Sequence, residues 1–421
     1  MIKTQANCFD GNESNLIHFE TAKKTILAAI PTIHDWQQIP IEQAKGRCLA
    51  ESIFSPINVP AHTNSAVDGY AIHSNDLPES NKECGLTIQA TVLAGQIYNE
   101  PCLPGHCIRI MTGAPMPKDL DTVIMQEHCQ RDTKIIRIDS RHKAGQNVRL
   151  AGEDINQGST VLDIGKKLTP PDIGLIASLG QAEIKVKRKL RIAIASTGDE
   201  IYSLSGTPAN GGLYDSNRYS LLAALDRPEI ELINLGIIKD QQTDLLDSFN
   251  SAADYADIIL STGGVSVGEA DFTKAALKSS GQINFWKVAI KPGRPIAFGK
   301  IKESTFFGLP GNPVAVMLTF YQFVLPAIEK MLGITNQAFA PILKARSLET
   351  IRKKPGRTEF PRGIVTQNEN NELQVKTTGK QGSGILSSMS QANAFIILEH
   401  DRDTIQKGEW INVQLFSNLF G

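Results

Sequence analysis

The sequence predicts a multidomain protein that combines α/β and all-β parts. Its 421 residues correspond to roughly three domains on length alone. From residue 190 to residue 332, apolar runs alternate with helical segments, as expected for a parallel sheet covered by helices. On either side, at residues 56–150 and 338–421, short β-rich runs alternate with turns rich in Pro, Gly and Asn.

Two helices are predicted around the first β-rich part. Residues 15–35 carry apolar side chains at helical spacing, and Asn15 is suited to cap that helix. Residues 170–180, PPDIGLIASLG, predict the second helix. We expect the two helices to pack together, with residues 56–150 inserted between them as a small all-β domain.

The α/β part is predicted from its strands. The runs RIAIAST, EIELINLGII and ADIILST lack polar alternation, and the segments between them, SNRYSLLAAL and QQTDLLDSFNSAAD, fit helices. A last helix is expected from Val314 to Leu332, with a kink or its weakest turn at Pro326.

The composition favours a soluble cytoplasmic protein. Net charge is −1 and 21% of residues are charged, which gives no reason to expect nucleic acid or an anionic membrane as partner. We expect no signal peptide, and no apolar run near the roughly 18 residues of a membrane helix. The cysteines are interpreted as reduced thiols; the alternative is a zinc site drawn from Cys102, His106, Cys107, His128 and Cys129.

Three predicted strands are followed by acids. Glu200, Asp240 and Asp271 each come after one of them. The carboxyl ends of parallel strands share one edge of the sheet, where ligands bind. These carboxylates therefore suit Mg²⁺ carrying a phosphate. The alternative is that each acid caps the next helix.

Two glycine-containing loops suggest anion binding. In LSTGGVSVGEAD, Gly263, Gly264 and Ser266 allow backbone N–H groups to surround an anion, although the spacing fits neither the dinucleotide motif nor the P-loop. In GLPGNP, residues 308–313, Asn312 and Pro313 are suited to begin a helix whose free N–H groups attract anions. The alternative for GLPGNP is simple punctuation between a strand and a helix.

Two lysines are predicted on one strand face. If WKVAIK is a single strand, Lys287 and Lys291 point the same way and lie roughly 13 Å apart at about 3.3 Å per residue. They then suit a long ligand with separated anionic groups, or else form a solvated face. Residues 64–71, 111–117 and 145–154 in the β-rich part are, from their residues alone, ordinary turns.

Taken together, these stretches resemble the molybdopterin molybdenumtransferases, which insert molybdate during molybdenum cofactor synthesis. The matching stretches include AKGRCLAE, NSAVDGYA, IMTGAPMP, DTVIMQE, GQNVRLAGED, PPDIGLIASLG, STGDEIYSL, LYDSNRYSL, NLGIIKD, STGGVSVGEADFTK, FWKVAIKPGRPIAFGK, FFGLPGNPVAV, GRTEFPRG and GSGILSSMSQANAFI. They follow the family's order along nearly the whole chain.

The resemblance implies a four-domain architecture. The expected domains are a discontinuous helical and extended domain (1–55 and 151–188), an inserted β domain (56–150), a three-layer α/β molybdopterin-binding domain (189–335) and a C-terminal β-barrel (336–421). It further implies a homodimer whose active site lies between the α/β domain of one subunit and the β domain of the other. The upstream adenylyltransferase is an expected partner.

The resemblance also implies the reaction: molybdate enters the dithiolene of adenylylated molybdopterin, and AMP is released with the help of Mg²⁺. Glu200, Asp240 and Asp271 would hold the metal or position the attacking oxygen. Gly263, Gly264 and Ser266 would line the pterin or its phosphate. The remaining implied site residues are Lys287 and Lys291 for charge balance, Pro310 and Pro313 for loop shape, Arg357 and Ser383 from the barrel, and Asp68, Thr112, Arg149 and Asp154 from the partner subunit.

Two departures from the family pattern and two rival functions accompany this prediction. Val67 stands where the family often has Met, and Gly384 where bacterial members often have His. The first rival is the adenylyltransferase of the preceding step, which shares the glycine loop but lacks the flanking domains. The second is a non-enzymatic scaffold; the presence of all three strand-end acids argues against it.

Overall fold

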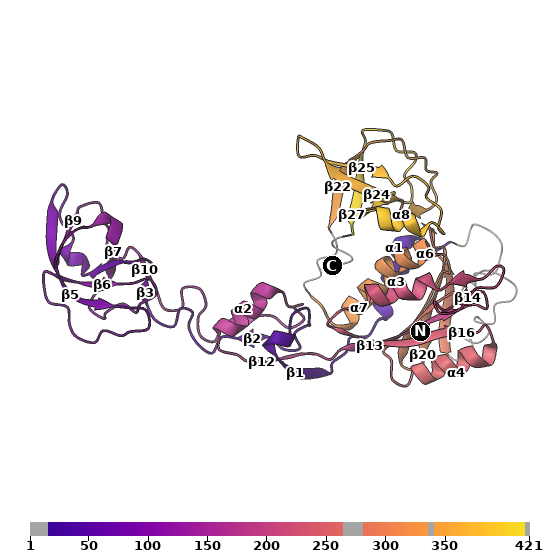
Figure 1. Ribbon diagram of the computed structural model, residues 1–421, viewed down its shortest axis with the longest axis horizontal. Coiled ribbons are helices and arrows are strands. Elements are labelled where there is room, and N and C mark those ends of the chain that lie inside the picture. Colours follow the sequence, from indigo (N-terminus) through magenta and orange to yellow (C-terminus); the bar gives the residue numbers. More distant parts are fainter. Residues whose placement is uncertain (1–15, 264–280, 336–340, 417–421) are drawn as a thin grey trace.

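The computed structural model describes residues 16–263, 281–335 and 341–416. The molecule is elongated, with a β domain at one end and the α/β sheet and barrel at the other (Figure 1). A small domain made of two two-stranded sheets and a helix connects them. The predicted domain boundaries stay a prediction, but the multidomain α/β plus β fold is confirmed.

The far end of the molecule is a mixed β-sheet with the strand order β7-β4-β6-β5-β9-β8. Its strands are β4 (Gly69–Ile72), β5 (Glu83–Val92), β6 (His106–Ile110), β7 (Thr122–Met125), β8 (Gln130–Asp132) and β9 (Ile135–Asp139). Apolar side chains pack into a core on each face of this sheet. Gly69 is required where strands meet, because a Cβ there would lie 2.0 Å from the carbonyl oxygen of Ile124.

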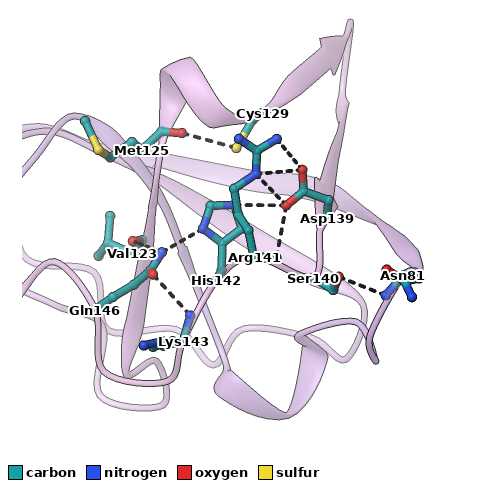
Figure 2. Close-up of polar contacts among 10 residues, drawn as sticks. All are labelled: Asn81, Val123, Met125, Cys129, Asp139, Ser140, Arg141, His142, Lys143 and Gln146. Carbon is teal, nitrogen blue, oxygen red and sulfur yellow. Dashed lines mark hydrogen bonds and ion pairs between the residues drawn. The ribbon is translucent and has the colours of Figure 1, made fainter.

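A polar network follows the end of β9 (Figure 2). Arg141 pairs with the Asp139 carboxylate, which keeps the pKa of Asp139 at about 2. The His142 side chain is only 2% exposed, with Asp139 3.9 Å from its Nε2. Its Nδ1 lies 2.9 Å from Gln146 Nε2. Burial lowers the pKa of His142, so the neutral imidazole is favoured in the folded protein.

The connecting body pairs segments from before and after the β domain. Strand β1 (Trp36–Pro40) pairs with β12 (Glu183–Lys187), and β2 (Ile53–Phe54) with β11 (Thr160–Leu162). Helix α2 (Pro170–Ser178) packs into their core, next to the 3-10 turn η2 (Ile41–Gln43). The chain therefore leaves and re-enters this body around an insertion.

The predicted pairing of the two helices is wrong. Helix α1 (Phe19–Ala29) contributes Phe19, Ala22 and Ile26 to the α/β core instead of packing on α2. The Phe19 ring contacts those of Phe323 and Phe360 edge-on. Helical spacing predicted the apolar stripe of α1 but could not tell which core would cover it.

The α/β sheet has the strand order β16-β13-β17-β21-β20-β18. Its strands are β13 (Leu190–Thr197), β16 (Ile230–Ile238), β17 (Ile258–Thr262), β18 (Gly281–Lys287), β20 (Pro295–Ile301) and β21 (Ser304–Leu309). The first four in spatial order are parallel, whereas β20 and β18 add antiparallel. Helix α3 (Ser216–Ala224) covers one face and α4 (Gln242–Ala252) the other, giving three layers.

The long helical segment after β21 changes winding before Pro326. It consists of α6 (Pro313–Thr319), a π-helical turn η5 (Phe320–Val324) and α7 (Leu325–Met331). Pro326 has no N–H for the preceding turn, so the irregularity falls where the sequence predicted it. Contrary to the composition-based expectation, Pro313–Met331 is long and apolar enough to cross a membrane, but 89% of its most apolar window is buried inside the protein.

The C-terminal strands form a closed barrel with the order β22-β25-β24-β26-β27. They are β22 (Ile342–Ser347), β24 (Arg362–Gln367), β25 (Leu373–Thr377), β26 (Ala394–Ile397) and β27 (Trp410–Leu415), with helix α8 (Leu386–Gln391) between β25 and β26. A short parallel pairing of β19 (Ile290–Lys291) with β23 (Thr358–Glu359) ties the barrel to the α/β part. This pairing brings barrel residues to the edge of the sheet where a ligand is expected.

Candidate active site

A pocket of about 900 Å³ lies at the carboxyl ends of β13 and β17. These neighbouring strands are the switch point of the parallel sheet, since β13 leads outward to β16 while β17 continues on the opposite side. Ligands of open α/β sheets bind at such points. The lining residues come from the strand ends, from α3 and α6, from residues 290–295, and from the barrel residues Arg357 and Gln381 to Gly384.

The pocket floor is made by the ends of β13 and β17. Gly263 has φ +91°, and a Cβ there would lie 2.2 Å from the Thr197 carbonyl oxygen. Only glycine allows this approach of the two strand ends. The buried Thr197 hydroxyl lines the pocket and has no hydrogen-bond partner among the described residues, so it is available to a ligand.

A buried acid fixes the start of α3 beside the floor. Asp215 is 2% exposed and caps the helix by accepting from the Arg218 N–H. Its carboxylate also accepts from Ser196 Oγ at 2.8 Å and from Arg218 Nε at 2.7 Å. Asp215 is thus fully engaged in holding β13 and α3 together, which makes it a structural acid of the pocket.

Asn217 connects two loops of the pocket. Its Nδ2 donates to Thr262 Oγ1 at 3.0 Å and to the Gly311 carbonyl at 2.7 Å. Its buried Oδ1 has no partner among the described residues. The side chain therefore fixes the end of β17 against the GLPGNP loop and leaves an acceptor for a ligand donor.

The predicted anion site at the start of α6 is only partly available. Asn312 is the N-cap, but its side chain makes no capping hydrogen bond, and Pro313 has no N–H. The next N–H, that of Val314, already donates to the Ser383 carbonyl at 3.1 Å. The GLPGNP loop thus docks the barrel onto the α/β part as well as lining the pocket.

Three basic side chains of the described residues line the pocket, two from residues 290–295 and one from the barrel part. These are Lys291, Arg294 and Arg357. Of the predicted strand-end acids that the structure describes, Glu200 lines the pocket. Lys291 forms an ion pair with Glu359 at 3.0 Å. These three basic groups suit a ligand with several anionic groups.

The two predicted lysines do not share one strand. Strand β18 ends at Lys287 and β19 begins at Ile290, so alternation does not carry across, and Lys287 is absent from the pocket lining. Prediction of a continuous WKVAIK strand is therefore wrong. The other predicted residues of this part, Gly263, Pro310, Pro313, Arg357 and Ser383, all line the pocket, as does Gly384.

The metal-binding acids are only partly described. Glu200 lines the pocket and Asp240 does not, while Asp271, Gly264 and Ser266 lie outside the described residues. Within the described ranges, no three His, Cys, Asp or Glu side chains are placed together to hold a metal. The alternative zinc site of the cysteines and histidines is therefore not formed there. The helix-capping alternative fails for Asp240, because Gln241 is the N-cap of α4.

The residues expected to act from a partner subunit lie in and beside the β domain. Asp68 Oδ1 accepts from both the N–H and the hydroxyl of Thr112 at 2.8 Å. These hydrogen bonds lower the pKa of the Asp68 carboxyl. Arg149 and Asp154 are exposed near the same end. None of the four lines the pocket of their own chain, which lies at the opposite end of the molecule (Figure 1).

The sequence interpretation missed several pocket residues. Asp215, Asn217, Arg294 and Gln381 received no role. The stretch DSNR carried a signal, because an Asp followed by a helix start is a typical N-cap. Gln381 carried none, since only the docking of the barrel brings it to the pocket.

Three family models match successive parts of the chain. Residues 17–180 match the "MoeA N-terminal region (domain I and II)", residues 193–330 the "Probable molybdopterin binding domain", and residues 344–416 the "MoeA C-terminal region (domain IV)". The molybdopterin molybdenumtransferase of Haemophilus influenzae is 39% identical over 96% of this chain and 100% of that protein. That of Nostoc is 34% identical over 89% of this chain and 87% of that protein.

A solved structure agrees with the whole architecture. The molybdopterin biosynthesis MoeA protein of Pyrococcus horikoshii superposes with a TM-score of 0.84, at 31% identity, over 95% of this chain and all of that one.

The fold and the pocket define a multidomain α/β protein that binds an anionic ligand at a sheet switch point closed by a β-barrel. The chain belongs to the MoeA family of molybdopterin molybdenumtransferases.

Proposed function

We propose that this protein inserts molybdate into the dithiolene of adenylylated molybdopterin and releases AMP. The observation that carries the proposal is the switch-point pocket, with its glycine floor and basic rim, in a chain that matches molybdopterin molybdenumtransferases along its length. A pocket of about 900 Å³ is of the size that holds a pterin nucleotide.

The chain's own residues divide the ligand between them. Gly263 and the Thr197 hydroxyl would contact the phosphate or pterin at the floor, while Lys291 and Arg357 balance the charge of molybdate and phosphate. Pro310 and Pro313 shape the neighbouring loop, and Ser383 closes the pocket from the barrel. Lys287 would act only on a part of the ligand that extends past the pocket.

We further propose that Mg²⁺ assists, held by Glu200 with Asp240 and Asp271. The chemistry fits, since Mg²⁺ prefers carboxylate oxygens and Glu200 lines the pocket. When bound, the ion would neutralise charge on the pyrophosphate. Removing Mg²⁺ with a chelator should therefore reduce AMP release, and adding it back should restore the rate.

We also propose a homodimer with a shared active site. The pair formed by Asp68 and Thr112 is pre-organised and exposed, yet lies at the opposite end of the molecule from the pocket of its own chain (Figure 1). A second copy would bring this pair, with Arg149 and Asp154, to the first copy's pocket. The upstream adenylyltransferase is the natural supplier of the substrate.

The function is tested by mixing the purified protein with adenylylated molybdopterin and Mg²⁺, adding molybdate, and following AMP. We expect AMP release that depends on molybdate; release without molybdate would contradict insertion. Glu200→Gln should slow release about tenfold or more, because a pocket carboxylate is lost. Glu303→Gln is the matched control, since the Glu303 side chain is 98% exposed and outside the pocket.

A further inference from the structure

A buried arginine stands behind the barrel wall of the pocket. Arg362, at the start of β24, is 1% exposed. Its Nε donates to Ser388 Oγ at 2.9 Å, and its Nη2 donates to the Gly382 carbonyl at 3.0 Å. In the described part of the chain, the Arg362 guanidinium forms no ion pair and no hydrogen bond with a carboxylate.

The main chain of Arg362 holds the same segment. Its N–H donates to Gln381 Oε1 at 2.8 Å, and Gln381 Nε2 donates back to the Arg362 carbonyl at 3.2 Å. The Thr378 N–H donates to that carbonyl as well, at 3.0 Å. The side chain and the backbone of Arg362 therefore both hold the segment from Thr378 to Gly382 in place.

That segment continues directly into the pocket. Gln381 to Gly384 line the pocket, while Arg362 itself does not. The Ser383 carbonyl accepts from the Val314 N–H at the start of α6. Helix α8 contacts both α6 and β24, and the three elements lie next to one another in Figure 1. Arg362 is thus the inner anchor of the loop whose outer end docks on the α/β part.

A buried guanidinium without a carboxylate partner is costly, because desolvation disfavours its charge. Burial lowers the pKa of Arg362 to about 10, so it stays protonated at neutral pH. Its planar fork reaches a hydroxyl and a carbonyl at once, which a lysine cannot reproduce. The arginine therefore suits a position from which one loop segment must be held in place.

We propose that Arg362 is a positioning residue for the oxyanion substrate, holding Gly382 so that Ser383 keeps its place in the pocket wall. This proposal rests on the proposed function, in which Arg357 balances the charge of molybdate and Ser383 closes the pocket from the barrel.

Two measurements on the full-length protein test it. In Arg362→Lys, hydrogen–deuterium exchange of the peptide covering residues 378–388 should become faster, because one hydrogen bond of the fork is lost. The KM for molybdate should rise about tenfold, as for loss of a hydrogen bond to a charged group, with a smaller change in kcat. Ser388→Ala keeps the charge and removes the acceptor of Nε, so it should shift both readouts in the same direction even if Arg362→Lys folds poorly.

Lys353→Met is the matched control. Lys353 is also buried in the C-terminal part, where its Nζ donates to the carbonyls of His400 and Arg402, but it lies outside the pocket. This variant should lower the melting temperature without changing exchange at 378–388 or the KM for molybdate. An equal rise of KM in Lys353→Met would overturn the proposal.

The outcomes separate this proposal from the proposed function. If the wild-type protein shows no molybdate-dependent AMP release, the proposed function fails, and the positioning of substrate fails with it. If release is normal but Arg362→Lys leaves exchange at 378–388 unchanged, only the role of Arg362 is rejected. Faster exchange with an unchanged KM limits Arg362 to the structure of the barrel and also rejects the proposal.

Discussion

At the scale of single residues, Gly263 decides whether the pocket floor can form. Its positive φ and its 2.2 Å approach to the Thr197 carbonyl leave no room for a side chain. We expect Gly263→Ala to lower the free energy of unfolding by about 1–3 kcal/mol and to abolish most AMP release. Thermal unfolding and the AMP assay measure the two effects.

Gly105→Ala provides the control for that prediction. Gly105 has a similar positive φ of +72°, but nothing lies within 4 Å of its Cβ position. The variant should lose about 1 kcal/mol of unfolding free energy through backbone strain and keep full activity. Equal losses of activity in both variants would show that the strand-end contact is irrelevant to the site.

Replacing the Asn217 side chain should weaken the action on the pterin substrate. Asn217→Asp removes the donor to Thr262 and Gly311 and places a negative charge against a carbonyl and the anionic ligand. We expect kcat/KM for the pterin substrate to fall about tenfold or more. Ser220→Ala, one turn further along α3 and outside the pocket, should keep wild-type kinetics. Wild-type kinetics in Asn217→Asp would exclude Asn217 from the site.

At the level of single elements, the polar network after β9 predicts how the stability of the β domain depends on pH. The pKa of His142 is lowered mainly by burial. Asp139 and the hydrogen bond with Gln146 oppose this shift, whereas His128 and Arg141 add to it. The unfolded chain therefore binds a proton near pH 6.5, whereas the folded protein binds it only at lower pH. Stability should be constant above that value and fall as the pH drops below it.

Replacing the histidine tests this dependence. His142→Gln should show a smaller fall of melting temperature between pH 7.5 and 5.5 than the wild type. His62→Gln, at an exposed position of the same domain, should keep the wild-type slope. A slope in His142→Gln equal to that of the wild type would assign the pH dependence to other groups.

At the scale of the whole molecule, the separation between the Asp68–Thr112 pair and the pocket predicts complementation between subunits. Asp68→Asn and Arg357→Ala should each be inactive alone. In a dimer with shared sites, random mixing of the two variants would produce half mixed dimers with one intact site each, so about a quarter of wild-type activity should return. The measurement is AMP release after mixing the two variants under conditions that allow exchange.

The result distinguishes the two arrangements of the site. Mixing two variants of the same end, Arg357→Ala with Lys291→Ala, should restore nothing, because both residues line one pocket. If the Asp68 and Arg357 variants also fail to complement while exchanging subunits, the shared site is rejected.

The pattern of helices and strands and the position of the pocket at the strand ends could be predicted from the residues alone. Unalternating apolar runs such as Leu190–Thr197 predicted parallel strands, because that pattern depends only on local spacing. The glycines after Thr262 predicted a ligand-binding loop at a strand end, and the structure shows that Gly263 is also needed for its close approach to Thr197. Pro326 predicted the irregular turn for an equally local reason, its missing N–H.

Which distant groups meet depends on the packing of the folded chain. The tertiary structure separated Lys287 from Lys291 by ending β18 between them, placed α1 on α7 instead of α2, and brought Gln381 and Ser383 from the barrel to the pocket. It also buried Arg362 behind them. These contacts join residues far apart in the chain, and their energies depend on packing and desolvation, which no local pattern of residues encodes.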